Sequence, residues 1–254
     1  KFTEDNLSRF AAKQGGLGDC WFVASISSLA GNKKFLNRVV CHDNSFDEKY
    51  AGIFHFRFWK FGDWVDVVID DRLPVKEDSN KLAYMSSSKG KEFWTPLLEK
   101  AYAKFRGGYQ NIGDGGLIEI AFQNFTGGVT ETHDLSEPPD SAIKFFRTKI
   151  NKNALIGAAV MEDKSNSDQL PSGHAYTITG ATKYKTTPLV RVRNPWGNKT
   201  EWRGAWSDNS DEWKKVPENF KKTVNFDVKD DGEFWMSYRD FIKNFQEVTM
   251  CNLS

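Results

Sequence analysis

A cysteine near the beginning of the chain has the neighbours that a thiol nucleophile needs. Cys20 stands directly before an apolar stretch, and Gln14 precedes it by six positions across the glycine-rich residues 15–18. A thiolate attacks a carbonyl carbon, and a side-chain amide such as that of Gln14 donates a hydrogen bond to the oxyanion that forms. The segment therefore predicts a nucleophile and an oxyanion donor, provided that the rest of the chain supplies a base and a group that orients it.

Of the four histidines, His174 has the setting of a catalytic base. It opens an alternating, strand-like run beside a loop, and Asn194 ends a second such run, which Pro195 stops. His174 lies 154 residues after Cys20, and Asn194 lies 20 residues further on. In papain-like proteases both follow the cysteine by about 130–150 residues. Each residue alone is compatible with a structural role, but the order of the set favours a Cys-His-Asn triad.

The hydrophobic pattern places these residues on regular elements. Residues 19–31 have helical spacing, with Asp19 as N-cap, so Cys20 falls in the first turn, where the helix dipole favours a thiolate. Residues 53–70 are typical of a hairpin, and residues 92–106 of a second helix. Beyond the glycine-rich residues 111–116 we expect strands over 154–161, 174–182, 189–194 and 232–238, a loop over 162–172, and a closing helix over 239–245.

The chain thus has a helix-rich first half and a strand-rich second half. We expect an α+β fold of two subdomains, residues 1–115 and 116–254, with a cleft between them. Cys20 and Gln14 fall on the first subdomain, whereas His174 and Asn194 fall on the second. The predicted active site is therefore split across the cleft.

Composition narrows the class of protein. The 254 residues carry 35 Lys and Arg against 34 Asp and Glu, so the net charge of +1 gives no reason to expect nucleic acid or an acidic membrane as partner. No apolar run approaches the ~20 residues of a membrane-spanning helix, and no signal pattern opens the chain. The three cysteines, Cys20, Cys41 and Cys251, suit a reducing, cytoplasmic location. Cys41 has only His42 beside it, so we expect a buried apolar role rather than a zinc site.

Several segments carry a resemblance to one family. Residues 14–22, 173–176 with 179–180, and 193–197 resemble the core of calpain cysteine proteases. The resemblance extends over nearly the whole chain through residues 50–56, 92–94, 98–104, 125–129 and 231–237. It implies a papain-like core, cleavage of protein substrates, and an inhibitor similar to calpastatin as a further partner. We expect the chain to be an excised catalytic core.

The chemistry assigns a role to each member of the set. Cys20, as thiolate, attacks the peptide carbonyl, while His174 holds the ion pair and then protonates the leaving amine. Asn194 orients the imidazole. The Gln14 amide and the Cys20 N–H stabilise the oxyanion.

Calcium enters through the resemblance. No EF-hand loop is present, because Trp213 stands where the loop beginning at Asp208 needs glycine, and the acidic residues of the second half by themselves favour solvated surface. The family carries two other calcium sites. In the second subdomain the matching residues are Glu201, Asp208, Asp231 and Glu233, with the carbonyl of Lys229.

The first-subdomain site departs from the family pattern. Glu92 matches a family ligand, but Ala11 stands where the family has an aspartate, so the site lacks one carboxylate. Backbone carbonyls near Glu4 and Asn6 are the remaining candidate ligands.

The resemblance also implies a gate. Without calcium the family's two halves are misaligned, and a tryptophan that matches Trp196 wedges between the cysteine and the histidine. Arg9 and Glu233 match an ion pair that links the subdomains in the active arrangement. Calcium shifts this equilibrium only if it binds the aligned state better.

Two alternatives remain open. Ala11, together with Lys13 directly before Gln14, motivates a calpain-like regulatory or binding module with weak or no activity. Acyl transfer of the transglutaminase kind also uses Cys and His, but commonly with Asp as third member, so Asn194 argues against it.

Overall fold

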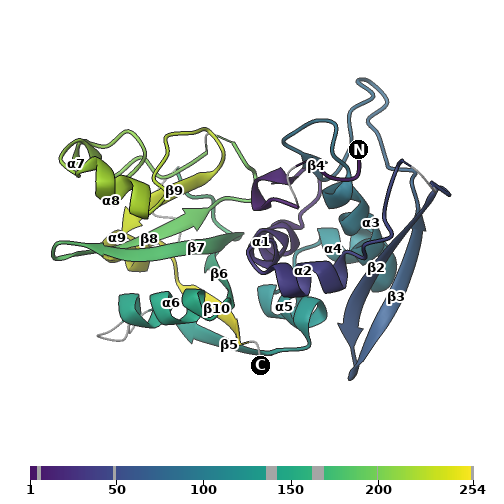
Figure 1. Cartoon of the computed structure of the whole chain (residues 1–254), viewed down its shortest axis with the longest axis horizontal. Coiled ribbons are helices and arrows are strands. Elements are labelled where there is room, and N and C mark those ends of the chain that lie inside the picture. Colours follow the sequence, from purple (N-terminus) through teal and green to yellow (C-terminus); the bar gives the residue numbers. More distant parts are fainter. Residues whose placement is uncertain (5–6, 48–49, 136–141, 162–168, 199, 253–254) are drawn as a thin grey trace.

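A computed structural model describes residues 1–4, 7–47, 50–135, 142–161, 169–198 and 200–252. The helix that begins at Cys20, α1 (Cys20–Leu29), lies in the middle of the molecule, between a hairpin and a large sheet (Figure 1). The hairpin and its helices form one side: α2 (Lys33–Val39), β2 (Ile53–Lys60), β3 (Asp63–Asp70), α3 (Trp94–Arg106), α4 (Gln110–Gly113) and α5 (Ile118–Thr126). Short pieces precede α1 and α3: a 3-10 turn (Arg9–Ala11), β1 (Ala12–Lys13) and β4 (Ser86–Ser87).

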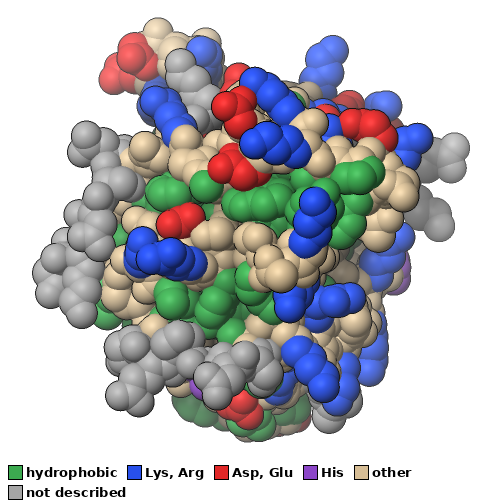
Figure 2. Space-filling view, turned by 90° about the vertical axis from the view of Figure 1, so that its left-hand side faces the viewer, with side chains coloured by type: hydrophobic (Ala, Val, Ile, Leu, Met, Phe, Trp, Pro, Cys, Tyr) green, Lys and Arg blue, Asp and Glu red, His purple; other side chains and the backbone are tan. Residues whose placement is uncertain are grey.

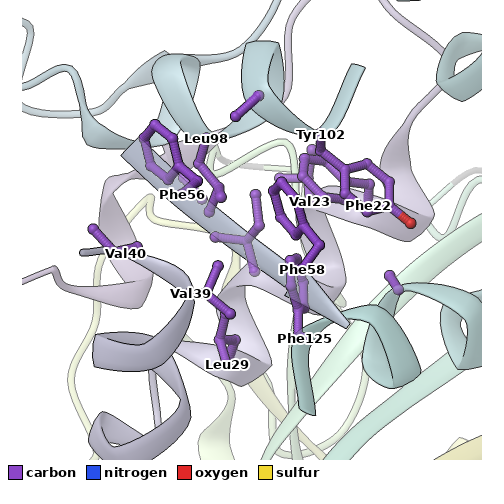
Figure 3. Packing of buried hydrophobic residues seen from close by; sticks show 14 of the residues in the cluster. Phe22, Val23, Leu29, Val39, Val40, Phe56, Phe58, Leu98, Tyr102 and Phe125 are labelled. Atoms are coloured by element: carbon purple, nitrogen blue, oxygen red, sulfur yellow. The ribbon is translucent and has the colours of Figure 1, made fainter. Parts of the chain in front are cut away.

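Aromatic side chains fill the first core. Phe22 of α1 stacks on Tyr102 of α3 with ring centroids 4.3 Å apart, and Phe58 of β2 meets the edge of the same tyrosine at 5.2 Å (Figure 3). These rings are fully buried, and Phe125 of α5 joins them. Burial of rings of this size stabilises each by about 1.5–3 kcal/mol, so this core holds α1 and its first residue, Cys20, in place.

The hairpin follows the alternation of the sequence. Phe54, Phe56 and Phe58 point inward on β2 and are fully buried, while the residues between them are more exposed. Phe61 and Gly62 both adopt positive φ, 52° and 93°, which a two-residue turn between strands requires.

A six-stranded antiparallel sheet forms the other side, in the order β5-β10-β6-β7-β8-β9. The first core extends to it through Leu155 and Ala175. Thr177 of the sheet also donates to the carbonyl of Ala24 in α1 at 2.7 Å. The second core lies on the sheet and includes Tyr176 and Phe241. The elements are β5 (Val129–Asp134), α6 (Ala142–Asn151), β6 (Leu155–Val160), β7 (His174–Tyr184), β8 (Thr187–Arg193), α7 (Asp211–Lys214), α8 (Glu218–Thr223), β9 (Glu233–Ser237), α9 (Tyr238–Asn244) and β10 (Glu247–Asn252).

The α+β class is confirmed, and the predicted elements that bear the site residues are present within a few residues of their expected ends. Three details differ. Asp19 precedes α1, but its side chain does not cap the helix. Cys41 is half-buried rather than buried. The neighbouring strands β5 and β10 were not predicted, and neither were α2 and α4 to α8. Most of the predicted loop 162–172, residues 162–168, lies outside the described residues.

The division at residue 115 stays a prediction. In the structure α5, which follows that position, packs into the first core through Ala121, Phe122 and Phe125. A helix can thus belong by packing to one half although it follows the glycine-rich stretch in sequence.

Charges of both signs share the surface at the sheet end of the molecule. Lys and Arg side chains lie there among Asp and Glu side chains around hydrophobic ones (Figure 2). Lys and Arg side chains are the more numerous at the lower right of this view. Within the described ranges, no helix is both long and apolar enough to cross a membrane.

Candidate active site

Cys20 and His174 lie where the two halves of the molecule meet. Cys20 is the first residue of α1 and His174 the first of β7. Both line a cavity of about 680 Å³, together with Gln14 and Trp196. The N-terminus of α1 and the start of β7 thus present a thiol and an imidazole to one cavity.

Asn194 holds the imidazole in a defined orientation. Its Oδ1 lies 2.9 Å from His174 Nε2 and also accepts the Trp196 N–H at 3.1 Å. Its amide group donates to the carbonyl of Thr200 at 2.9 Å, which fixes which end of the amide faces the ring. Because Oδ1 only accepts, Nε2 carries the hydrogen, and Nδ1 keeps the lone pair that a base needs.

Two aromatic side chains flank His174. Tyr176 meets it edge-on with ring centroids 4.9 Å apart, and Trp196 lies tilted at the same distance. Burial lowers the pKa of His174, while its hydrogen bond to Asn194 opposes that shift. The ring is therefore neutral near pH 7 in this arrangement.

The thiol is also uncharged in this arrangement. Burial raises the pKa of Cys20, although the Ala175 N–H favours the thiolate. Among the described residues, no hydrogen bond joins the Cys20 sulfur to His174. The structure thus brings these two described residues to one cavity without a hydrogen bond between them.

Gln14 also spans the two halves. Its backbone N–H donates to the carbonyl of Pro195 at 3.0 Å, and its side-chain NH₂ donates to the carbonyl of Leu17 at 2.8 Å. Gln14 also lines the cavity that Cys20 and His174 share.

Two buried carboxyls lie beneath the nucleophile, and the sequence did not predict their burial. Asp19 and Glu99 are 0% and 1% exposed, and their carboxyl groups interact electrostatically. Burial raises the pKa of Asp19 to about 6 and that of Glu99 well above its usual range. The available signal was Glu99 itself, a charged residue on the apolar side of a helix.

Two arginines, Arg9 and Arg193, connect the halves at a second place. Arg9 forms a two-pronged ion pair with Glu233, with Nε–Oε1 at 3.0 Å and Nη2–Oε2 at 3.1 Å. Arg191 lies 3.5 Å from the same carboxylate. Arg193, which the sequence argument missed, is fully buried and donates to the carbonyl of Ala12 at 3.1 Å. Three cations thus surround the joint between the halves.

The second predicted calcium site borders a cavity of about 630 Å³. Asp208, Lys229, Asp231 and Glu233 line it, together with Arg9. Glu201 lies behind it, and its Oε1 accepts the Gly232 N–H at 2.7 Å. Burial, with neighbouring carboxylates adding to it, raises the pKa values of Glu201 and Asp208 to about 7.

The oxygen atoms of this second site are of the type that calcium binds, but they lie too far apart to hold one ion as they stand. Carboxylate and carbonyl oxygens are the ligands that calcium prefers. Within the described part of the chain, however, the only three metal-binding side chains with ligand atoms within 4.8 Å of one another lie elsewhere. Glu233 pairs with Arg9 and Arg191. Calcium binding at this cavity would therefore require the carboxylates to move closer together.

The first predicted calcium site does not fit. Glu92 Oε1 accepts from Thr3 Oγ1 at 2.9 Å and from the Glu4 N–H at 2.8 Å, and Oε2 accepts from Ser87 Oγ at 2.9 Å. Ala11 is buried and contributes no ligand. Three protein donors already occupy most of the lone-pair positions of this carboxylate, so a cation would have to compete with them. Asn6, named with Glu4 as a carbonyl donor, lies outside the described residues.

Comparison with known proteins gives a consistent result. A family described as "Calpain family cysteine protease" matches residues 1–252. Calpain-A of Drosophila melanogaster is 43% identical over 267 residues, which cover 100% of this chain and 32% of that protein. The mouse (Mus musculus) Calpain-8 is 45% identical over 266 residues, and the mouse Calpain-1 catalytic subunit is 44% identical over 264 residues. Each covers 100% of this chain, and the matches take in 37% and 36% of those proteins. The chain thus spans about a third of the length of these relatives.

Proposed function

We propose that this chain, which belongs to the calpain family of cysteine proteases, cleaves peptide bonds in proteins under the control of calcium. The observation that carries the proposal is the His174–Asn194 pair, which faces the same cavity as the Cys20 end of α1. A bare Nδ1 on an oriented imidazole is what a thiol needs to become a nucleophile.

The proposed reaction follows from the atoms at hand. His174 takes the proton of Cys20, and the sulfur attacks the substrate carbonyl carbon. The oxyanion receives hydrogen bonds from the Gln14 amide and the Cys20 N–H, each worth about 2.7–4 kcal/mol in the transition state. His174 then protonates the leaving amine, and a water that it activates releases the acyl group from the sulfur. Asn194 keeps the His174 ring in the same orientation throughout the reaction.

Alignment is the proposed point of control. Glu201, Asp208, Asp231 and Glu233, with the Lys229 carbonyl, would hold calcium. The bound ion would supply the positive charge that lets these carboxylates approach. Because Glu233 also pairs with Arg9 of the other half, a movement of β9 is passed to the segment before α1. The first site is left out, since Glu92 is satisfied by protein donors.

Trp196 is the proposed obstacle in the resting state. Its ring lies against His174 and lines the cavity that also receives Cys20. We propose that it turns away when the halves approach, which lets the sulfur reach Nδ1. Protein substrates, a calpastatin-like inhibitor as partner and a cytoplasmic location complete the proposal.

The test is hydrolysis of an unstructured protein, such as casein, by the wild-type chain and by Cys20→Ala, with calcium and with chelator. The proposal expects turnover only by the wild type and only with calcium. No turnover under any condition, with a folded chain, favours a regulatory or binding module. Incorporation of an added amine that exceeds hydrolysis favours acyl transfer instead.

A further inference from the structure

A second group of side chains with potential ligand atoms lies outside the catalytic cavity and takes no part in the proposed reaction. Cys41 follows α2, Asp43 lies two residues on, and His55 is on β2. One ligand atom from each, a sulfur, a carboxylate oxygen and a ring nitrogen, lies within 4.8 Å of the other two. The partner of Cys41 is therefore His55, not the adjacent His42.

The side chain of Asn44 holds the two segments of this group together. Its amide donates to the carbonyl of Cys41 at 3.0 Å and to that of His55 at 2.7 Å, while its Oδ1 accepts the His55 N–H at 2.7 Å. One side chain thus joins the loop that carries the cysteine to the strand that carries the histidine. The positions of both are set before anything binds.

The far nitrogen of His55 is also engaged. Nε2 lies 2.6 Å from Asp66 Oδ1, and that oxygen accepts a hydrogen from Arg57 Nε at 2.7 Å. A carboxylate that accepts the hydrogen of one ring nitrogen orients the ring and makes the other nitrogen a better metal ligand. His55 Nδ1 then presents its lone pair to Asp43 Oδ2 at 3.5 Å.

The ligand atoms of a thiol, a carboxylate and an imidazole therefore lie close together at one place. We propose that Cys41, Asp43 and His55 form a binding site for a divalent transition metal of the zinc type. Thiolate, imidazole and carboxylate together suit Zn²⁺, whereas Ca²⁺ and Mg²⁺ select oxygen alone. The Cys41 thiol gives its proton to solvent as it coordinates, and water fills the fourth position.

The distances suit this assignment. Bonds of about 2.0–2.3 Å in a tetrahedron place neighbouring ligand atoms roughly 3.3–3.6 Å apart. The His55–Asp43 distance of 3.5 Å is already in that range. Asp43 is 68% exposed in its side chain, so it can turn to close the wider separations. Bound metal would tie the loop after α2 to the hairpin and stabilise the first half of the molecule, independently of calcium.

The experiment uses the 254-residue chain with Cys20→Ser, which removes the catalytic thiol as a competing ligand, and excess calcium, which saturates other carboxylates. Zn²⁺ is titrated calorimetrically, and Co²⁺ is titrated optically, because a cobalt–thiolate bond gives a near-ultraviolet charge-transfer band. Cys41→Ser and His55→Ala are compared with His42→Ala, a matched control one residue from the site. Circular dichroism of each metal-free variant checks its fold.

The proposal expects one Zn²⁺ per chain and a cobalt–thiolate band. Cys41→Ser should abolish the band, both site variants should weaken Zn²⁺ binding at least tenfold, and His42→Ala should change it less than twofold. The absence of a band in the parent chain overturns the proposal and leaves a proton on His55 as the cation. A loss with His42→Ala equal to that with Cys41→Ser also overturns it, because it identifies the sequence-adjacent pair instead.

Discussion

Replacing Asp19 by asparagine should make the stability of the protein less dependent on pH. Asp19 is completely buried beneath the nucleophile and lies against Glu99. Asparagine has nearly the same shape but cannot ionise. The substitution therefore removes the cost of a negative charge at this position, together with its repulsion of Glu99.

The magnitude follows from the pKa. Burial raises the pKa of Asp19 from 3.8 to about 6. At about 1.36 kcal/mol per pKa unit, ionisation of the folded protein costs about 3 kcal/mol more than ionisation of the unfolded chain. The folded state binds the proton of Asp19 more tightly, so the contribution of this residue to stability is fully present below pH 3.8 and is lost as pH rises through 6. The free energy of unfolding of Asp19→Asn, relative to the wild type, should thus increase by up to about 3 kcal/mol between pH 4 and pH 7.5.

Urea unfolding, followed by tryptophan fluorescence at pH values from 4 to 7.5, measures this difference. Subtracting wild type from variant cancels the contributions of other carboxyls, such as Glu201 and Asp208. Asp78→Asn, at an exposed position, is the control and should give a difference independent of pH. A difference for Asp19→Asn that is flat, or that shrinks as pH rises, would refute the reasoning.

Four further substitutions test other parts of the account. Asn194→Ala frees the His174 ring and should lower kcat on the order of 10²-fold with little change in KM, as steady-state kinetics would show. Gln14→Ala removes an oxyanion donor and should lower kcat about 10²- to 10³-fold; an unchanged kcat excludes it from that role. Arg9→Ala breaks a partly exposed ion pair worth about 1 kcal/mol, so the calcium concentration for half-maximal activity should rise about fivefold. Phe22→Ala leaves a cavity against Tyr102 and should lower the free energy of unfolding by about 3–5 kcal/mol in urea titrations.

The sequence was most informative where periodicity and motif agreed. The helix that starts at Cys20 and the hairpin over 53–70 have strong hydrophobic patterns, and both are present. Strand β5 was missed because its side chains are mainly polar and exposed, so that its pairing with β10 decides its conformation. No local pattern reports such a pairing between residues more than 100 positions apart.

The candidate site shows the same limit. Cys20, His174 and Asn194 were predicted from order and spacing, because each stands at the end of a predicted element. The Asp19–Glu99 contact joins two helices, and the Cys41–His55 contact joins a loop to a strand. Both depend on packing that a linear pattern does not contain. Asp19 was interpreted as a helix cap for that reason, and Cys41 as a small apolar residue.

The most direct test of the central proposal is the alkylation rate of Cys20 by iodoacetamide at pH 6, with calcium and with chelator. Peptide mapping by mass spectrometry separates Cys20 from Cys41 and Cys251. If calcium brings His174 to the sulfur, the rate in the wild type should rise at least tenfold with calcium, and in His174→Ala it should stay constant. Equal rates with and without calcium in the wild type would contradict the account.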